Sequence, residues 1–166
     1  SASDWATEIA ADTGEHVFKQ SSTLSGYAWM RKRRELTPAD FGAVPTTARE
    51  TGTDSTTAIY DWVNFLKVAK RHCGLLDDAY RFAGSSAFDL AGANHGMKIR
   101  GLNAHWSGFF LDDSVSVRIE GANSFYHSFV DFWVNGDNVG PIFQLGKNDF
   151  YDDFNGCYLE LIIKNA

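Results

Sequence analysis

The stretch Leu36–Val63, LTPADFGAVPTTARETGTDSTTAIYDWV, holds the signals that decide the expected fold. Near its start, Pro38 bars the continuation of a helix and Gly42 can supply a turn. A polar loop over residues 46–53 follows. The run Asp54-Ser55-Thr56-Thr57 then reads as a helix start, with Thr53 or Asp54 as the capping residue. The stretch therefore predicts a turn, a loop and the beginning of a helix.

An amphipathic helix is predicted from Asp54 to about His72. Large apolar side chains recur at helical spacing along one side, and polar side chains can face solvent on the other. The apolar side contains Ile59, Trp62, Val63, Phe65, Leu66 and Ala69. The basic residues before Gly74 suit the negative end of a helix, so we expect the helix to end there.

Short strand-like runs separated by turn residues make up the chain from Gly74 onward. Residues 98–104, KIRGLNA, align with residues 118–124, RIEGANS, at an offset of 20 residues. A period of this length with short strands suggests a parallel β-solenoid, in which stacked coils share one core. A β-sandwich whose glycine and asparagine turns are similar by chance is the alternative.

Composition excludes several classes of protein. The 166 residues suit one domain with a short appendage, and 15 Lys and Arg against 21 Asp and Glu give a net charge of −6. This charge argues against a general binder of nucleic acids or of anionic membranes, and no apolar run is long enough for insertion across a membrane. Cys73 and Cys157 form neither a disulfide scaffold nor a metal knuckle. The histidines lack the spacing of zinc ligands, so neither a metal nor another cofactor is predicted.

Residues 34–104 resemble the N-terminal part of pectate-lyase-like parallel β-helix proteins, which are common among bacteriophage tail spikes and tail fibres. Asp40-Phe41-Gly42-Ala43 matches the family's first strand in full. Asp54-Ser55-Thr56 matches the start of its capping helix, with Ser55 in place of Asp. The run Asp77-Asp78-Ala79-Tyr80 stands where the family has a Pro-x-Gly-x-Tyr turn, and the loop before the helix lacks the usual Gly-Asp-Gly.

The resemblance implies a mainly β fold with two parts. Residues 1–35 would be a short irregular or helical neck or virion-anchor segment. Residues 36–166 would be the start of a right-handed parallel β-helix, capped by the amphipathic helix. Because the last strand-like run ends without a capping element, we expect the chain to be the first part of a longer protein.

The function that the resemblance implies is structural. The chain would be an extracellular component of the phage tail, a homotrimer that attaches to host cell-surface polysaccharide and contacts tail or baseplate proteins through its N-terminal segment. Any polysaccharide cleavage would lie mainly beyond Ala166. The alternative is a secreted polysaccharide lyase or glycoside hydrolase of the same fold.

Acidic residues are the candidate catalytic groups, because carboxylates on a β-helix groove can act as acid and base in glycoside cleavage. Adjacent Asp residues point to opposite faces of a strand, so no adjacent pair is itself a catalytic dyad. Solvated turn residues are the competing interpretation. The candidates are Asp112, Asp113, Glu120, Asp152, Asp153 and Glu160.

Two further groups of side chains could mediate binding. Trp106, Trp133, Tyr126 and Tyr151 could present flat faces to sugars, whereas most Phe side chains are expected in the core. The basic run at residues 31–34 has no interleaved aromatic residues, so it does not predict nucleic-acid binding. An exposed linker, or pairing with Glu35 or Asp40 between subunits, accounts for it better.

Overall fold

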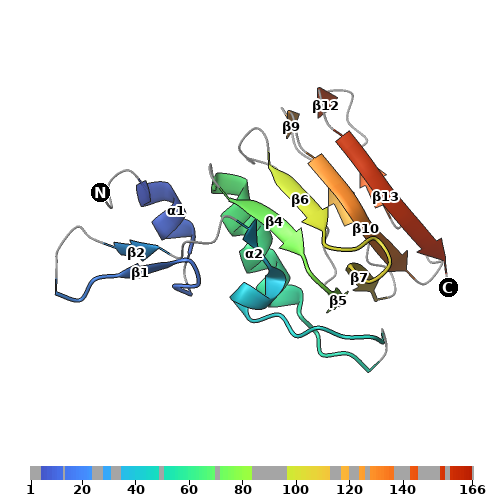
Figure 1. Cartoon of the computed structure of the whole chain (residues 1–166), viewed down its shortest axis with the longest axis horizontal. Coiled ribbons are helices and arrows are strands. Elements are labelled where there is room, and N and C mark those ends of the chain that lie inside the picture. The colour runs from blue at the N-terminus through green and yellow to red at the C-terminus, as the bar shows by residue number, and fades with distance from the viewer. Residues whose placement is uncertain are drawn as a thin grey trace.

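The computed structural model consists of a mostly parallel β-sheet with helix α2 (Thr56–Val68) packed against it, and a small N-terminal unit beside that helix (Figure 1). It describes residues 5–12, 14–23, 28–30, 35–48, 51–69, 72–83, 97–112, 117–119, 124–125, 128–136, 143–145, 154–155 and 158–165. Beyond residue 112, side chains are described at residues 130–135.

The main sheet contains seven strands in the order β3-β4-β6-β10-β7-β5, with β13 also paired to β10. Every pairing in this sheet is parallel. Its strands are β3 (Glu35–Leu36), β4 (Cys73–Leu76), β5 (Ala79–Phe82), β6 (Lys98–Gly101), β7 (Gly108–Leu111), β10 (Ser128–Gly136) and β13 (Tyr158–Asn165). Two smaller parallel pairs join β8 (Val117–Ile119) to β11 (Phe143–Leu145) and β9 (Ser124–Phe125) to β12 (Phe154–Asn155).

The predicted right-handed parallel β-helix is wrong. The described strands form a mostly parallel sheet with helices beside it, an α/β-like arrangement rather than a solenoid. Strand β6 pairs with β4 and β10, whereas the segment aligned with it at Arg118 pairs with β11. The offset of 20 residues therefore reflects a shared strand-and-turn composition and not stacked, equivalent coils. Because every pairing in the main sheet is parallel, the structure does not support the alternative of a β-sandwich either.

Strand β10 bends in its middle. Asp131 has a φ of 61°, and the register with β13 shifts between Phe129 and Phe132. The first part of β10 pairs with β6 and the later part with β7, while β13 follows the whole strand. A strand has two edges, so β6 and β7 share one edge of β10, one after the other. At the bend, Gly101 of β6 lies against the backbone carbonyl of Asp131.

Helix α2 confirms the predicted amphipathic helix, although it ends at Val68, before His72. Its N-terminus is close to the predicted one, because Asp54 Oδ1 accepts a hydrogen bond from the Thr56 amide at 2.9 Å. The indole N–H of Trp62 donates to the Leu36 carbonyl of β3 at 2.8 Å. This bond ties the helix to the sheet. The side chains that α2 buries are Ile59, Trp62, Val63, Phe65 and Leu66.

The segment before the loop forms a short helical turn, η2 (Pro38–Phe41), that begins and ends where its residues require. Thr37 and Asp40 form a capping box, with the Thr37 amide donating to Asp40 Oδ2 at 3.0 Å. Gly42 ends the turn at a φ of 94°, in the left-handed region that glycine tolerates best. Phe41 is buried beside Phe65 of α2, so the turn adds to the core.

The N-terminal unit contains helix α1 (Ala6–Ala11) and an antiparallel hairpin of β1 (Phe18–Gln20) and β2 (Ala28–Met30). The buried carboxylate of Asp12 accepts hydrogen bonds from the backbone amides of residues 16–18, which fixes the chain between α1 and β1. Phe18 is buried in the core and its ring lies 6.2 Å from that of Phe65. The hairpin itself points away from the sheet (Figure 1).

His72 links the N-terminal unit to the end of α2. Its ring lies beside those of Trp5, Phe18 and Phe65, and its buried Nδ1 atom has no hydrogen-bond partner. Burial lowers the pKa of His72 below 6.5, and the nearby Glu8 carboxylate opposes this shift only in part.

We expect the free energy of unfolding to fall as the pH drops below about 6.5, because the unfolded chain then binds a proton that folded His72 resists. The contribution is complete above the unfolded pKa and is lost toward the depressed folded pKa. Urea denaturation at a series of pH values gives the free energy of unfolding as a function of pH. This free energy should change less with pH for His72→Phe than for the original chain. Equal slopes in the two proteins would show that His72 does not govern this pH dependence.

Candidate functional site

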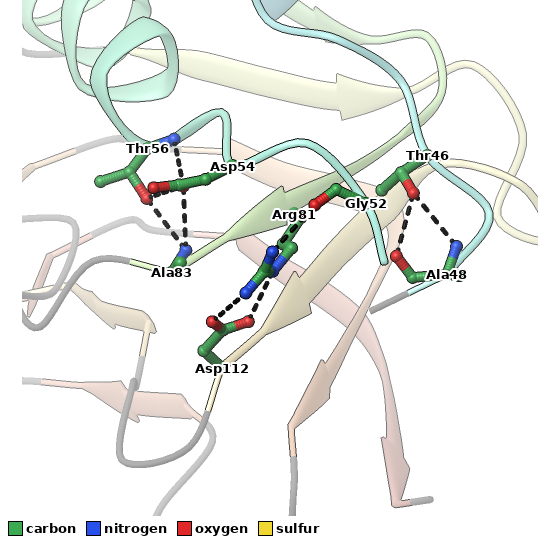
Figure 2. Close-up of polar contacts among 8 residues, drawn as sticks. All are labelled: Thr46, Ala48, Gly52, Asp54, Thr56, Arg81, Ala83 and Asp112. Carbon is green, nitrogen blue, oxygen red and sulfur yellow. Dashed lines mark hydrogen bonds and ion pairs between the residues drawn. The ribbon is translucent and has the colours of Figure 1, made fainter. Parts of the chain in front are cut away.

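A polar cluster joins the loop before α2 to the ends of β5 and β7, and we call it the polar clamp (Figure 2). Arg81 of β5 donates from Nε and Nη2 to the two carboxylate oxygens of Asp112, at 3.0 and 2.7 Å. Its Nη1 donates to the Gly52 carbonyl at 2.8 Å. The hydrogen bonds to Asp112 raise the pKa of Arg81, so the guanidinium stays charged. Two parallel bonds of this kind fix the orientation of both side chains.

The second half of the polar clamp is centred on Asp54. Its Oδ1 accepts hydrogen bonds from the Thr56 hydroxyl at 2.6 Å and from the Thr56 amide, and the Ala83 amide donates to the Thr56 hydroxyl at 2.9 Å (Figure 2). Burial opposes ionisation of Asp54, but these bonds outweigh it and lower the pKa of its carboxyl. The clamp therefore holds the start of α2 against the end of β5.

Of the six candidate catalytic residues, Asp112 is the one whose side chain the structure describes. Both of its oxygens accept from Arg81, so its role in the described structure is to orient the clamp. Glu160 lies in β13, but its side chain is outside the described residues. The other four candidates also lie outside the described residues: Asp113, Glu120, Asp152 and Asp153.

A second feature is the five-residue turn Leu102–Trp106 between β6 and β7, which we call the aromatic turn. Ser107 is buried directly behind it, and its hydroxyl accepts the amides of Leu102 and Asn103, both at 3.1 Å. Asn103 accepts the His105 amide on its side chain and the Trp106 amide on its backbone carbonyl. The turn is thus held in one conformation by its own polar groups.

The aromatic turn is also attached to the sheet on both sides. The Leu102 amide donates to the Leu76 carbonyl of β4 at 2.9 Å. From β10, the Trp133 indole N–H donates to the His105 carbonyl at 3.2 Å. Because these hydrogen bonds fix the backbone of the turn, a ligand would bind to a surface that is already ordered.

Large apolar side chains project from this ordered turn. Trp106 is 65 % exposed and Leu102 is 60 % exposed. The exposed His105 ring stands edge-on to the Trp106 ring, with centroids 4.9 Å apart and an interplanar angle of 86°. An indole held in this way presents a flat apolar face to solvent together with a polar N–H group.

The four aromatic residues predicted as sugar contacts separate into different environments. Trp106 is exposed, as a contact residue must be, whereas Trp133 is buried and packs against Phe110 with ring centroids 4.8 Å apart. Tyr126 and Tyr151 lie outside the described residues. Among the phenylalanines, Phe109 and Phe132 confirm the expected core position.

Comparison with known proteins adds no relative to this description. No family model, curated protein or solved structure is found to match the chain. Within the described ranges, no group of three or more His, Cys, Asp or Glu side chains is arranged to hold a metal ion. None of the described helices has the length and apolar character needed to cross a membrane.

Proposed function

We propose that this chain is a structural component of a bacteriophage tail that attaches to polysaccharide on the host surface, and that the aromatic turn is its contact site. The tail assignment is supported by the resemblance of residues 34–104 to tail spike and tail fibre sequences. The attachment role is supported by one observation above all: Trp106 is exposed on a turn that its own hydrogen bonds hold in place.

Sugar rings suit such a surface because they combine apolar C–H faces with hydroxyl groups. The Trp106 indole can cover a C–H face and its N–H can donate a hydrogen bond at the ring edge, while the ring nitrogen atoms of His105 can donate or accept others. Because the turn is already ordered, little conformational entropy is lost on binding. The exposed Leu102 extends the apolar surface beside the indole.

The net charge of the chain narrows the class of polysaccharide. At −6, the protein repels acidic polymers at low ionic strength, so a neutral polysaccharide is the better ligand. The polar clamp also favours binding over cleavage. Both carboxylate oxygens of Asp112 accept hydrogen bonds from Arg81, so this carboxylate is not placed to act as a catalytic acid or base. We therefore expect attachment without hydrolysis by this chain.

Replacing Trp106 by alanine is expected to weaken binding to a neutral polysaccharide by about tenfold, the loss of one well-placed aromatic contact. Affinity electrophoresis with purified neutral capsular and O-antigen polysaccharides cast into the gel measures this change. Trp106→Phe should retain most of the affinity because it keeps a flat ring. Val44→Ala, at an exposed apolar residue of the loop before α2, should bind like the original chain.

Two results would contradict the proposal. One is equal retardation of the Trp106→Ala variant and the original chain in every gel that retards the original chain. The other is a steady release of new reducing ends from the polysaccharide by the chain alone, which would favour the glycoside hydrolase or lyase alternative.

A further inference from the structure

Strand β10 contains one extra residue where it bends. Phe129 and Phe132 are three residues apart, whereas their partners on β13, Leu159 and Leu161, are two residues apart. This is the geometry of a β-bulge, in which an extra residue on one strand interrupts the pairing and redirects a side chain. Asp131 lies in this bulge with a φ of 61°.

The bulge lies against the aromatic turn. Before the bulge β10 pairs with β6, and after it β10 pairs with β7. Residues 131–132 therefore lie opposite the connection between β6 and β7, which is the aromatic turn. Gly101, just before the turn, lies against the backbone carbonyl of Asp131. Just after the turn, the carbonyl of Ser107 accepts the Trp133 amide at 3.1 Å. Backbone contacts on both sides of the turn thus hold Asp131 beside it.

The bulge presents the carboxylate of Asp131 to solvent. Asp131 is exposed, whereas Phe132 and Trp133, which follow it in β10, are buried. Among the described residues, none forms a hydrogen bond or an ion pair with the Asp131 side chain. Aspartate tolerates a left-handed backbone better than most residues, but glycine adopts it more readily. Bulges and exposed residues in such conformations are frequent beside ligand-binding sites.

We propose that Asp131 determines the specificity of the polysaccharide site, by accepting hydrogen bonds from hydroxyl groups of the sugar ring that covers Trp106. This inference rests on the function proposed for the aromatic turn. A carboxylate has two acceptor oxygens, so it accepts from two neighbouring hydroxyl groups, and its charge strengthens both bonds. The turn supplies the apolar contact with the ring face, and Asp131 supplies polar contacts at the ring edge. The site therefore selects neutral sugars whose neighbouring hydroxyl groups are unsubstituted.

Affinity electrophoresis of Asp131→Gly in gels that contain a neutral polysaccharide tests the proposal. Glycine removes the carboxylate and suits the backbone, so binding should weaken by about tenfold while the midpoint of thermal unfolding does not fall. Asp131→Asn keeps one acceptor oxygen and should lose less affinity. The matched control is Glu15→Gly, at an exposed acidic residue of the N-terminal unit with a φ of 52°, which should bind like the original chain.

A partly O-methylated form of the same polysaccharide tests the specificity. Methylation keeps the sugar rings and removes hydroxyl donors. The original chain should bind the methylated form about tenfold more weakly than the unmodified form. Asp131→Gly should bind the two forms about equally, because it lacks the acceptor that distinguishes them.

Two results would reject the role of Asp131 and leave the aromatic turn as the contact site. One is retardation of Asp131→Gly equal to that of the original chain in gels where Trp106→Ala is retarded less. The other is an equal loss of affinity on methylation for the original chain and Asp131→Gly. A lower unfolding midpoint in both Asp131→Gly and Asp131→Asn would assign the carboxylate to the fold, which also overturns the proposal. If neither Trp106→Ala nor Asp131→Gly weakened binding, the proposed function itself would fail.

Discussion

Replacing Trp62 by alanine is expected to lower the free energy of unfolding by about 4 kcal/mol, a large part of the stability of a domain of this size. Trp62 is fully buried between α2 and the sheet, so its removal leaves a cavity. The change also leaves the buried Leu36 carbonyl without the indole N–H that donates to it at 2.8 Å. Denaturation with urea, followed by circular dichroism, measures the loss.

Two further variants of α2 separate the loss of buried volume from the loss of the hydrogen bond. Trp62→Phe keeps most of the apolar volume and removes the hydrogen bond, so its effect should be smaller than that of alanine. Asn64→Ala changes an exposed residue of α2 and should alter stability by less than about 0.5 kcal/mol. If Trp62→Ala were as mild as Asn64→Ala, α2 would not be packed on the sheet as described.

Replacing Gly101 by alanine is expected to cost about 3 kcal/mol, at the upper end for overpacking, because the new methyl group meets backbone and not a movable side chain. A Cβ atom at this position would collide with the carbonyl of Asp131, where β10 bends. Relief requires β6 and β10 to separate, and this would break the pairing of Ile99 with Phe129.

Gly42→Ala is the control for Gly101→Ala. Its φ of 94° strains any side chain, but a Cβ atom there meets nothing within 4 Å. Gly42→Ala should therefore cost about 1 kcal/mol, from backbone strain alone. Thermal and urea unfolding of the two variants compares the steric effect with the effect of backbone strain. If Gly101→Ala lowered the free energy of unfolding no more than Gly42→Ala does, β6 and β10 would not approach each other as closely as described.

The sequence was sufficient to predict α2 because its signals are local. Apolar residues from Ile59 to Leu66 follow a helical period, and the predicted start is close to the observed one, although the N-cap is Ser55 and not Thr53 or Asp54. The arrangement of the strands was not predictable in the same way. Strand partners such as Lys98 of β6 and Ser128 of β10 are 30 positions apart, with three other strands between them, and a short apparent repeat gave the wrong pairing.

The candidate sites also depend on contacts between residues far apart in the sequence, which the sequence did not predict. Arg81 lies in the part of the chain after Gly74 where short strands were predicted, and Asp112 was a candidate catalytic acid, but nothing in the sequence links two residues 31 positions apart. The aromatic turn was partly predictable: Trp106 and Trp133 both looked able to contact sugars. The structure separates them: the Trp133 indole is buried and donates to the His105 carbonyl, which supports the turn, whereas Trp106 is exposed to solvent.

The attachment site is tested most directly by hydrogen exchange of the backbone amides in the presence of a neutral polysaccharide that the chain binds. The aromatic turn is predicted to exchange more slowly when the ligand is present, at the amides of residues 102–107. Peptides from α2 and from the β1–β2 hairpin should be unaffected by the ligand. Slower exchange at saturating ligand in any other segment, with the aromatic turn unchanged, would contradict the assignment of this turn as the contact site.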